Sequence, residues 1–100
     1  LNALMDFLDI SYTRADLKVE HFSSNLGLSK AQLYRKVKGL TGKSLNTFVK
    51  EYRLEKALQL LLKKRGNISE VAFDTGFNSP AYFSKCFSQA YHILPSQLVR

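Results

Sequence analysis

The sequence is poor in the features of disulfide-stabilised and membrane-embedded proteins. Cys86 is its only cysteine, so no disulfide can form within the chain, and this usage fits a reducing compartment such as the cytoplasm. No run of 18 or more apolar residues and no basic-then-apolar leader occur, so we expect no membrane span, no signal peptide and no membrane contact by this segment. Leu1 in place of methionine suggests a piece of a longer protein.

Patterns of catalytic and metal-binding residues are also missing. His21 and His92 have no cysteine or histidine neighbours at metal-ligand spacing, no glycine-rich phosphate loop occurs, and the Ser, His and Asp residues form no recognisable nucleophilic arrangement. We therefore expect no enzyme activity, no metal and no cofactor. A surface or boundary position is favoured for His21, and core or boundary filling rather than redox chemistry for Cys86.

Acidic residues are scarce, and the cations are concentrated in one third of the chain. Eight Asp and Glu residues oppose fifteen Lys and Arg residues, which gives a net charge of +7. Residues 1–29 carry two cations and four acids, residues 30–65 carry eleven cations and two acids, and residues 66–100 carry two of each. The middle block, at +9, predicts a face that binds a polyanion. The alternative is a solvated helix surface.

Two stretches, residues 25–38 and 74–87, have nearly the same pattern. Each consists of a short helix ended by glycine, a tight turn, a serine cap and a second helix with a cation near its middle. This is a helix-turn-helix unit, which usually places its second helix in the major groove of DNA. At an offset of 50 residues, the matched pairs are Ser29 and Ser79, Leu33 and Phe83, Arg35 and Lys85, Val37 and Phe87, and Gly42 and His92.

Apolar spacing and capping residues predict one all-α domain over residues 1–100. Its predicted parts are a first helix-turn-helix unit (1–44), a linker helix (45–64) and a second unit (65–100). Twenty helical residues span about 30 Å, close to the roughly 34 Å advance of one DNA turn.

Within the first unit we expect helices over 2–12, 19–26 and 30–40. In the second unit, one helix begins at Asn67 or Ser69 and another at Asn78 or Ser79, and a last short helix begins at Pro95 and contains Leu98. The inward stripe of the third helix is predicted to be Leu33, Val37 and Leu40.

Three blocks of sequence, residues 28–42, 53–61 and 68–87, resemble the DNA-binding domain of AraC-type (AraC/XylS) bacterial transcription regulators. The resemblance runs from about Leu4 to Leu98. It implies a seven-helix, homeodomain-like double helix-turn-helix fold, with the third and sixth helices entering successive major grooves. The sequence departs from the family pattern at His92, where glycine is common, and at Leu94, where serine is common, and both departures bear on the last turn.

Residues 33–42 are also similar to the C-terminal domains of hybrid two-component regulators. This second resemblance implies sensor and receiver domains in the parent chain as partners, with RNA polymerase as a further candidate. In that arrangement, phosphorylation elsewhere in the parent protein controls the domain, and this segment supplies the output.

The outward faces of the third and sixth helices supply the candidate DNA contacts. Arg35 is the leading base reader because a guanidinium can bond guanine O6 and N7 together, with a phosphate contact as its alternative. Lysines position the duplex through phosphates. Serine caps mark helix N-termini, which bind phosphates. The predicted base readers are Lys30, Ala31, Tyr34, Arg35, Ser79, Ala81, Ser84 and Lys85. The predicted phosphate contacts are Ser29, Lys36, Lys38, Lys43, Ser44, Ser69 and Tyr82.

Three questions stay open at this point, two about individual positions and one about the whole chain. Core packing competes with a DNA-backbone contact for Tyr82, and a solvated helix end is favoured over phosphate binding for the cations at 63–65. For the whole chain, the competing function is a helical protein-interaction module whose basic face binds an acidic partner.

Overall fold

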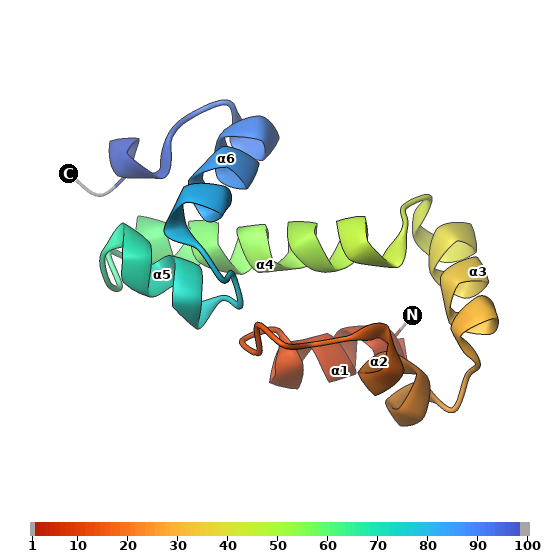
Figure 1. The fold of residues 1–100 in the computed structure, drawn as a ribbon. Coiled ribbons are helices and arrows are strands. Elements are labelled where there is room, and N and C mark those ends of the chain that lie inside the picture. Colours follow the sequence, from red (N-terminus) through yellow and green to blue (C-terminus); the bar gives the residue numbers. More distant parts are fainter. Residues whose placement is uncertain (1, 99–100) are drawn as a thin grey trace.

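The computed structural model describes residues 2–98, which form two helical lobes joined by one long helix (Figure 1). Within this range there is no strand, and no helix combines the length and apolarity needed to cross a membrane. The all-α prediction is confirmed. The elements are α1 (Asn2–Ser11), α2 (Val19–Leu26), α3 (Lys30–Thr41), α4 (Leu45–Leu62), α5 (Ile68–Asp74), α6 (Pro80–Tyr91) and a 3₁₀ turn, η1 (Pro95–Gln97).

Two of the predicted helices end differently in the structure. The seventh is a single 3₁₀ turn, in which the Leu98 amide bonds the Pro95 carbonyl at 3.0 Å, three residues back. Helix α4 ends at Leu62, two residues before the predicted end. Lys64 takes a left-handed conformation (φ 55°), and the Arg65 amide returns to the Leu60 carbonyl at 2.9 Å, which closes the helix.

Side-chain caps set the helix starts. The Ser29 hydroxyl accepts from the Gln32 amide at 3.2 Å, as predicted. Asn67, rather than Ser69, caps α5 by accepting from the Glu70 amide at 2.8 Å. The prediction of Ser69 as a cap is therefore wrong, because that residue already lies in the first helical turn. Ser79 caps α6, and Pro80 occupies the first position, where a missing N–H costs nothing.

Helix α4 carries two apolar stripes on nearly opposite sides. The first, Leu45, Val49 and Tyr52, packs into the core of the first lobe, and the second, Leu54, Ala57 and Leu61, packs into the core of the second. At 100° per residue the stripes are roughly 150° apart around the helix axis. This arrangement explains why the linker helix is apolar around most of its circumference, and it leaves the lobes with separate cores.

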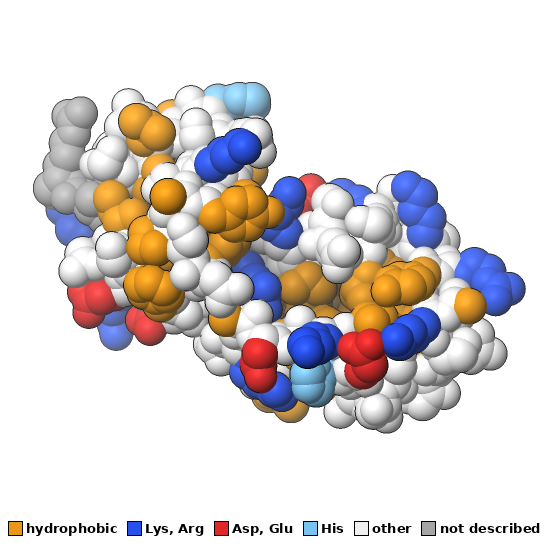
Figure 2. All heavy atoms as spheres, viewed as in Figure 1, with side chains coloured by type: hydrophobic (Ala, Val, Ile, Leu, Met, Phe, Trp, Pro, Cys, Tyr) orange, Lys and Arg blue, Asp and Glu red, His pale blue; other side chains and the backbone are white. Residues whose placement is uncertain are grey.

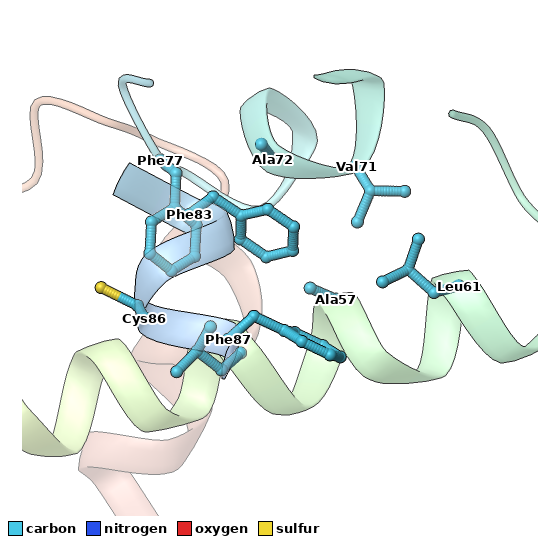
Figure 3. Close-up of a cluster of buried hydrophobic side chains, with 9 residues drawn as sticks. Ala57, Leu61, Val71, Ala72, Phe77, Phe83, Cys86 and Phe87 are labelled. Atoms are coloured by element: carbon cyan, nitrogen blue, oxygen red, sulfur yellow. The ribbon is translucent and has the colours of Figure 1, made fainter. Parts of the chain in front are cut away.

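Aromatic side chains fill the second core (Figure 3). The Phe83 ring lies 5.1 Å from that of Phe77 and 5.7 Å from that of Phe87, measured between ring centroids. Cys86 is buried beside them, as expected for a core-filling residue. In the first lobe, Leu33 and Val37 are buried but Leu40 is 60% exposed, so its assignment to the inward stripe is wrong. In the described part of the chain, no neighbouring element packs closely over the Leu40 side chain.

Arg53 joins the lobes away from both cores. Its Nε donates to the Tyr12 carbonyl at 3.0 Å and its Nη2 donates to the Arg14 carbonyl at 2.7 Å, so α4 holds the loop between α1 and α2. Burial lowers the pKa of the Arg53 guanidinium. Gly76, in the turn of the second unit, lies against the same guanidinium and the Tyr12 carbonyl. Residues from three segments therefore meet at one point.

We expect Gly76→Ala to lower the free energy of unfolding by at least about 2 kcal/mol, because positive φ strains alanine and overpacking adds to that strain. A Cβ at Gly76 (φ 91°) would collide with the Tyr12 carbonyl and lie 2.7 Å from Arg53 Nε. Gly27 is the matched control, with φ 66° and nothing within 4 Å of the corresponding Cβ position. Gly27→Ala should cost only about 0.5–1 kcal/mol, the conformational part alone. Urea unfolding of both variants measures the difference, and equal losses would contradict the close approach.

His92 occupies the position that Gly42 occupies in the first unit. Both end a recognition-type helix in the left-handed conformation, with φ 62° at His92 and 75° at Gly42. Each amide bonds the carbonyl four residues back, at 2.8 Å to Ser88 and 2.9 Å to Lys38. The departure from glycine at this position therefore leaves the geometry of the helix end unchanged.

A histidine in this conformation is strained, so we expect His92→Gly to stabilise the domain by about 0.5–1 kcal/mol after the entropy of glycine is subtracted. The melting temperature should rise by a few degrees. Gly42→Ala, the converse change in the other unit, should lower it by a similar amount. A fall on His92→Gly would show that the imidazole makes a stabilising contact.

Candidate nucleic-acid interface

The outward face of α3 carries the densest group of predicted contacts. Leu33 and Val37 are buried against the first core and fix the rotation of the helix. The predicted contacts that this rotation leaves exposed are Ser29, Lys30, Ala31, Tyr34, Arg35, Lys36 and Lys38. Every predicted contact of this helix is thus open to a ligand.

Two of the predicted cations are engaged by acids from other elements. Lys30 Nζ lies 2.7 Å from Glu20 Oε1 on α2, and this contact raises the pKa of Lys30 and lowers the pKa of Glu20. Lys43 forms an ion pair with Glu51 on α4. Each acid lies on a different element from its lysine partner, so the spacing of residues along the sequence did not indicate either ion pair. The pair at Glu20 is kept at neutral pH, and on the acid side it is lost as pH falls through the lowered pKa of the Glu20 carboxyl.

Arg35 and Lys36 are not in ion pairs among residues 2–98. Lys38 donates from Nζ to the Gly42 carbonyl at 3.0 Å, a neutral partner at the end of its own helix. The charges of these three side chains are therefore not neutralised within the described chain. Because of these three side chains, the outward face of α3 is more cationic than the outward face of α6.

Helix α6 presents a sparser face. Ala81, Tyr82 and Lys85 are exposed, whereas Ser79 and Ser84 are half-buried. Tyr82 is 53% exposed, so it is a surface residue whose ring lies against Phe77, with 6.3 Å between centroids. A side-chain hydrogen bond with Cys86 raises the pKa of the Tyr82 hydroxyl.

The remaining predicted contacts lie at other helix starts. The Ser44 hydroxyl accepts from the Thr47 amide at 3.2 Å and donates to Thr47 Oγ1 at 3.0 Å, so it caps α4 as expected. Ser69 is exposed in the first turn of α5, where Asn67 is the cap. His21 has a structural task, because its Nδ1 accepts from the Lys18 amide at 2.9 Å at the start of α2. In the described part of the chain, no three His, Cys, Asp or Glu residues gather as metal ligands.

A groove of about 510 Å³ separates the two lobes, and sequence reasoning did not predict it. The hollow is visible between the upper and lower masses in Figure 2. Its walls come from the α1–α2 loop and α2, from the first half of α4, and from the turn and first residues of α6. Among residues 2–98, three cations line it, Lys18, Lys50 and Arg53, and no Asp or Glu does. Residues distant in sequence form these walls, so no local motif indicates them.

The two lobes define a class of protein: a domain with two helix-turn-helix units on one linker helix. Residues 22–100 match the family described as "Helix-turn-helix domain". The chain belongs to this family, as an AraC-type DNA-binding domain.

Two curated relatives are similar over most of the chain. One is "Histidine kinase P4" of Formosa agariphila, 45% identical over 76 residues, or 76% of this chain and 6% of that protein. The other is the "HTH-type transcriptional regulator MtrA" of Neisseria gonorrhoeae, 41% identical over 70 residues, or 70% of this chain and 23% of that protein. The chain thus spans less than a quarter of the length of either relative.

A solved structure supports the fold. It is a transcriptional regulator from Chromobacterium violaceum, described among AraC-type DNA-binding domain-containing proteins. The match has a TM-score of 0.88 and 24% identity, and it covers 99% of this chain and 88% of that one. The arrangement of both units around α4 is therefore a known architecture.

Proposed function

We propose that this chain binds double-stranded DNA sequence-specifically and regulates transcription, with α3 and α6 entering successive major grooves. The supporting observation is that α3 and α6, each capped by a serine and each with one exposed face, lie in the two separate lobes of one molecule. The extents of the molecule are 44 × 22 × 21 Å, longer than the roughly 34 Å of one DNA turn. The eighteen residues of α4 span about 27 Å between the units.

The proposed roles follow the chemistry of the exposed side chains. Arg35 reads a base edge, and Lys85 contacts a base or a nearby phosphate. The other proposed base contacts are Lys30, Ala31, Tyr34, Ser79, Ala81 and Ser84, and the proposed phosphate contacts are Ser29, Lys36, Lys38, Lys43, Ser44, Ser69 and Tyr82. Lys30 and Lys43 exchange or share their carboxylate partners when DNA arrives.

The parent protein is proposed to be a bacterial regulator acting in the cytoplasm, with this domain as its non-enzymatic output. Sensor and receiver domains are proposed elsewhere in the parent chain, and the similarity to a protein named as a histidine kinase supports the sensor part of this proposal. A contact with RNA polymerase would belong to the same regulatory step.

Selection of the chain on random-sequence duplexes, followed by footprinting, tests the function. We expect one enriched sequence protected over two successive major grooves on one face of the duplex. If about five phosphates are neutralised, the logarithm of the affinity should fall against the logarithm of the salt concentration with a slope of about −4 to −5. Equal binding to heparin and to every duplex would contradict specific recognition and favour the acidic-partner alternative.

The unequal charge of the two helices yields a second test. Arg35→Ala should weaken binding to the selected duplex more than Lys85→Ala does, because a bidentate arginine–guanine pair contributes about 1–3 kcal/mol of discrimination. Gel shifts of both variants at one salt concentration measure the order. Lys63→Ala, at the exposed end of α4, is the charge control. The reverse order would refute the dominance of the first unit.

A further inference from the structure

We propose that the groove between the lobes binds the sugar–phosphate backbone of the DNA segment that connects the two major grooves. This inference rests on the proposed function and adds a third contact region to the two recognition helices. Its leading phosphate ligand is Lys50, supported by Lys18. Both residues lie outside the two repeated stretches, residues 25–38 and 74–87, that contain the helix-turn-helix motifs.

The position of the groove favours this ligand. One wall contains Ser79 and Tyr82, from the cap and first turn of α6, and another contains Asn46 and Thr47, from the first turn of α4. The groove thus lies beside the N-terminal end of α6, the second recognition helix. Its other wall, the first turn of α4, follows directly after α3, the first recognition helix, in the sequence. A duplex that contacts both helices must carry its backbone across the space between them.

The charge of the groove is of one sign. Among residues 2–98, neither Lys18 nor Lys50 takes part in an ion pair, and Arg53 bonds neutral carbonyls, so it keeps its charge. The acids of α4, Glu51 and Glu55, lie about 100–160° from Lys50 and Arg53 around the helix axis. They lie by a different depression on the other side of α4. The helix therefore turns Lys50 and Arg53 to the groove and its acids away from it, while its third cation, Lys56, lies over the Tyr12 and Tyr52 rings.

The surroundings of Lys50 also favour a contact between its ammonium group and a phosphate in this groove. It is half-buried, and the groove has an apolar floor that includes Phe22, Val49 and Phe77. A lysine stem packs on such a surface while its ammonium group stays in the open part of the site. Asn46, Thr47 and Asn78 add uncharged hydrogen-bond donors on the walls. This combination suits a phosphodiester, which needs cations and donors without a carboxylate nearby.

The test compares Lys50→Gln with the wild-type chain on two forms of the selected duplex. One form has its natural backbone, and the other has uncharged methylphosphonate linkages between the two contacted major grooves. On the natural duplex, Lys50→Gln should lose about fivefold in affinity near 0.15 M salt and flatten the salt slope by about one, the value for one phosphate contact. The base preference should not change. On the methylphosphonate duplex, which the wild type binds less tightly, the substitution should have no further effect.

Three controls separate the outcomes. Lys63→Gln removes the same charge from the exposed end of α4, outside the groove, and should leave the difference between the duplexes intact. Lys50→Arg keeps the charge and should keep the affinity, and Lys18→Gln provides a second variant if Lys50→Gln melts below the assay temperature. Equal losses on both duplexes would overturn the groove proposal while leaving specific binding in place. Absence of any preferred duplex for the wild type would instead overturn the proposed function.

Discussion

The relative placement of the two helix-turn-helix units depends on α4, which packs into both cores, and on one further contact between the lobes, at Arg53. The two apolar stripes of α4 lie on nearly opposite sides of the helix and serve separate cores, so no shared core fixes one lobe against the other. Arg53 supplies that connection by binding two main-chain carbonyls of the α1–α2 loop beside Gly76. Carbonyl partners satisfy its donors without cancelling its charge. The same side chain can therefore join the lobes and contribute positive potential to the groove between them.

The fold determines where the positive charge of the chain is exposed. The sequence concentrates cations between residues 30 and 65, but the fold neutralises some of them and exposes others. Glu20 and Glu51 engage Lys30 and Lys43, which leaves Arg35 and Lys36 outside ion pairs on α3 in the described chain. The acids of α4 lie away from the groove. The fold thus places cations of this stretch that are outside ion pairs in two places, the outward face of α3 and the groove between the lobes.

Local signals explain why much of the fold could be predicted. Ser29, Ser79 and the glycines that end the first helix of each unit specify helix boundaries through bonds within a few residues, and their spacing repeats. The prediction for Leu40 failed because the deciding fact was not local, whereas Ser69 lost to a neighbouring cap, Asn67. Leu40 continues the period of Leu33 and Val37, yet its side chain stays mostly exposed within residues 2–98. Ser69 competed with Asn67 for one capping position, and the sequence alone favoured neither.

The candidate site also has one part that local sequence signals predict and one part that they do not. The exposed faces of α3 and α6 follow from periodicity, since Leu33, Val37, Phe83 and Phe87 determine which residues face outward. The groove could not be predicted, because Lys18, Lys50 and Ser79 meet only after α4 has brought the two units together. The repeat is therefore symmetrical in its backbone and unequal in its charge. A poorly charged α6 can still contribute to DNA binding if the cationic groove beside its first turn supplies affinity that its own side chains lack.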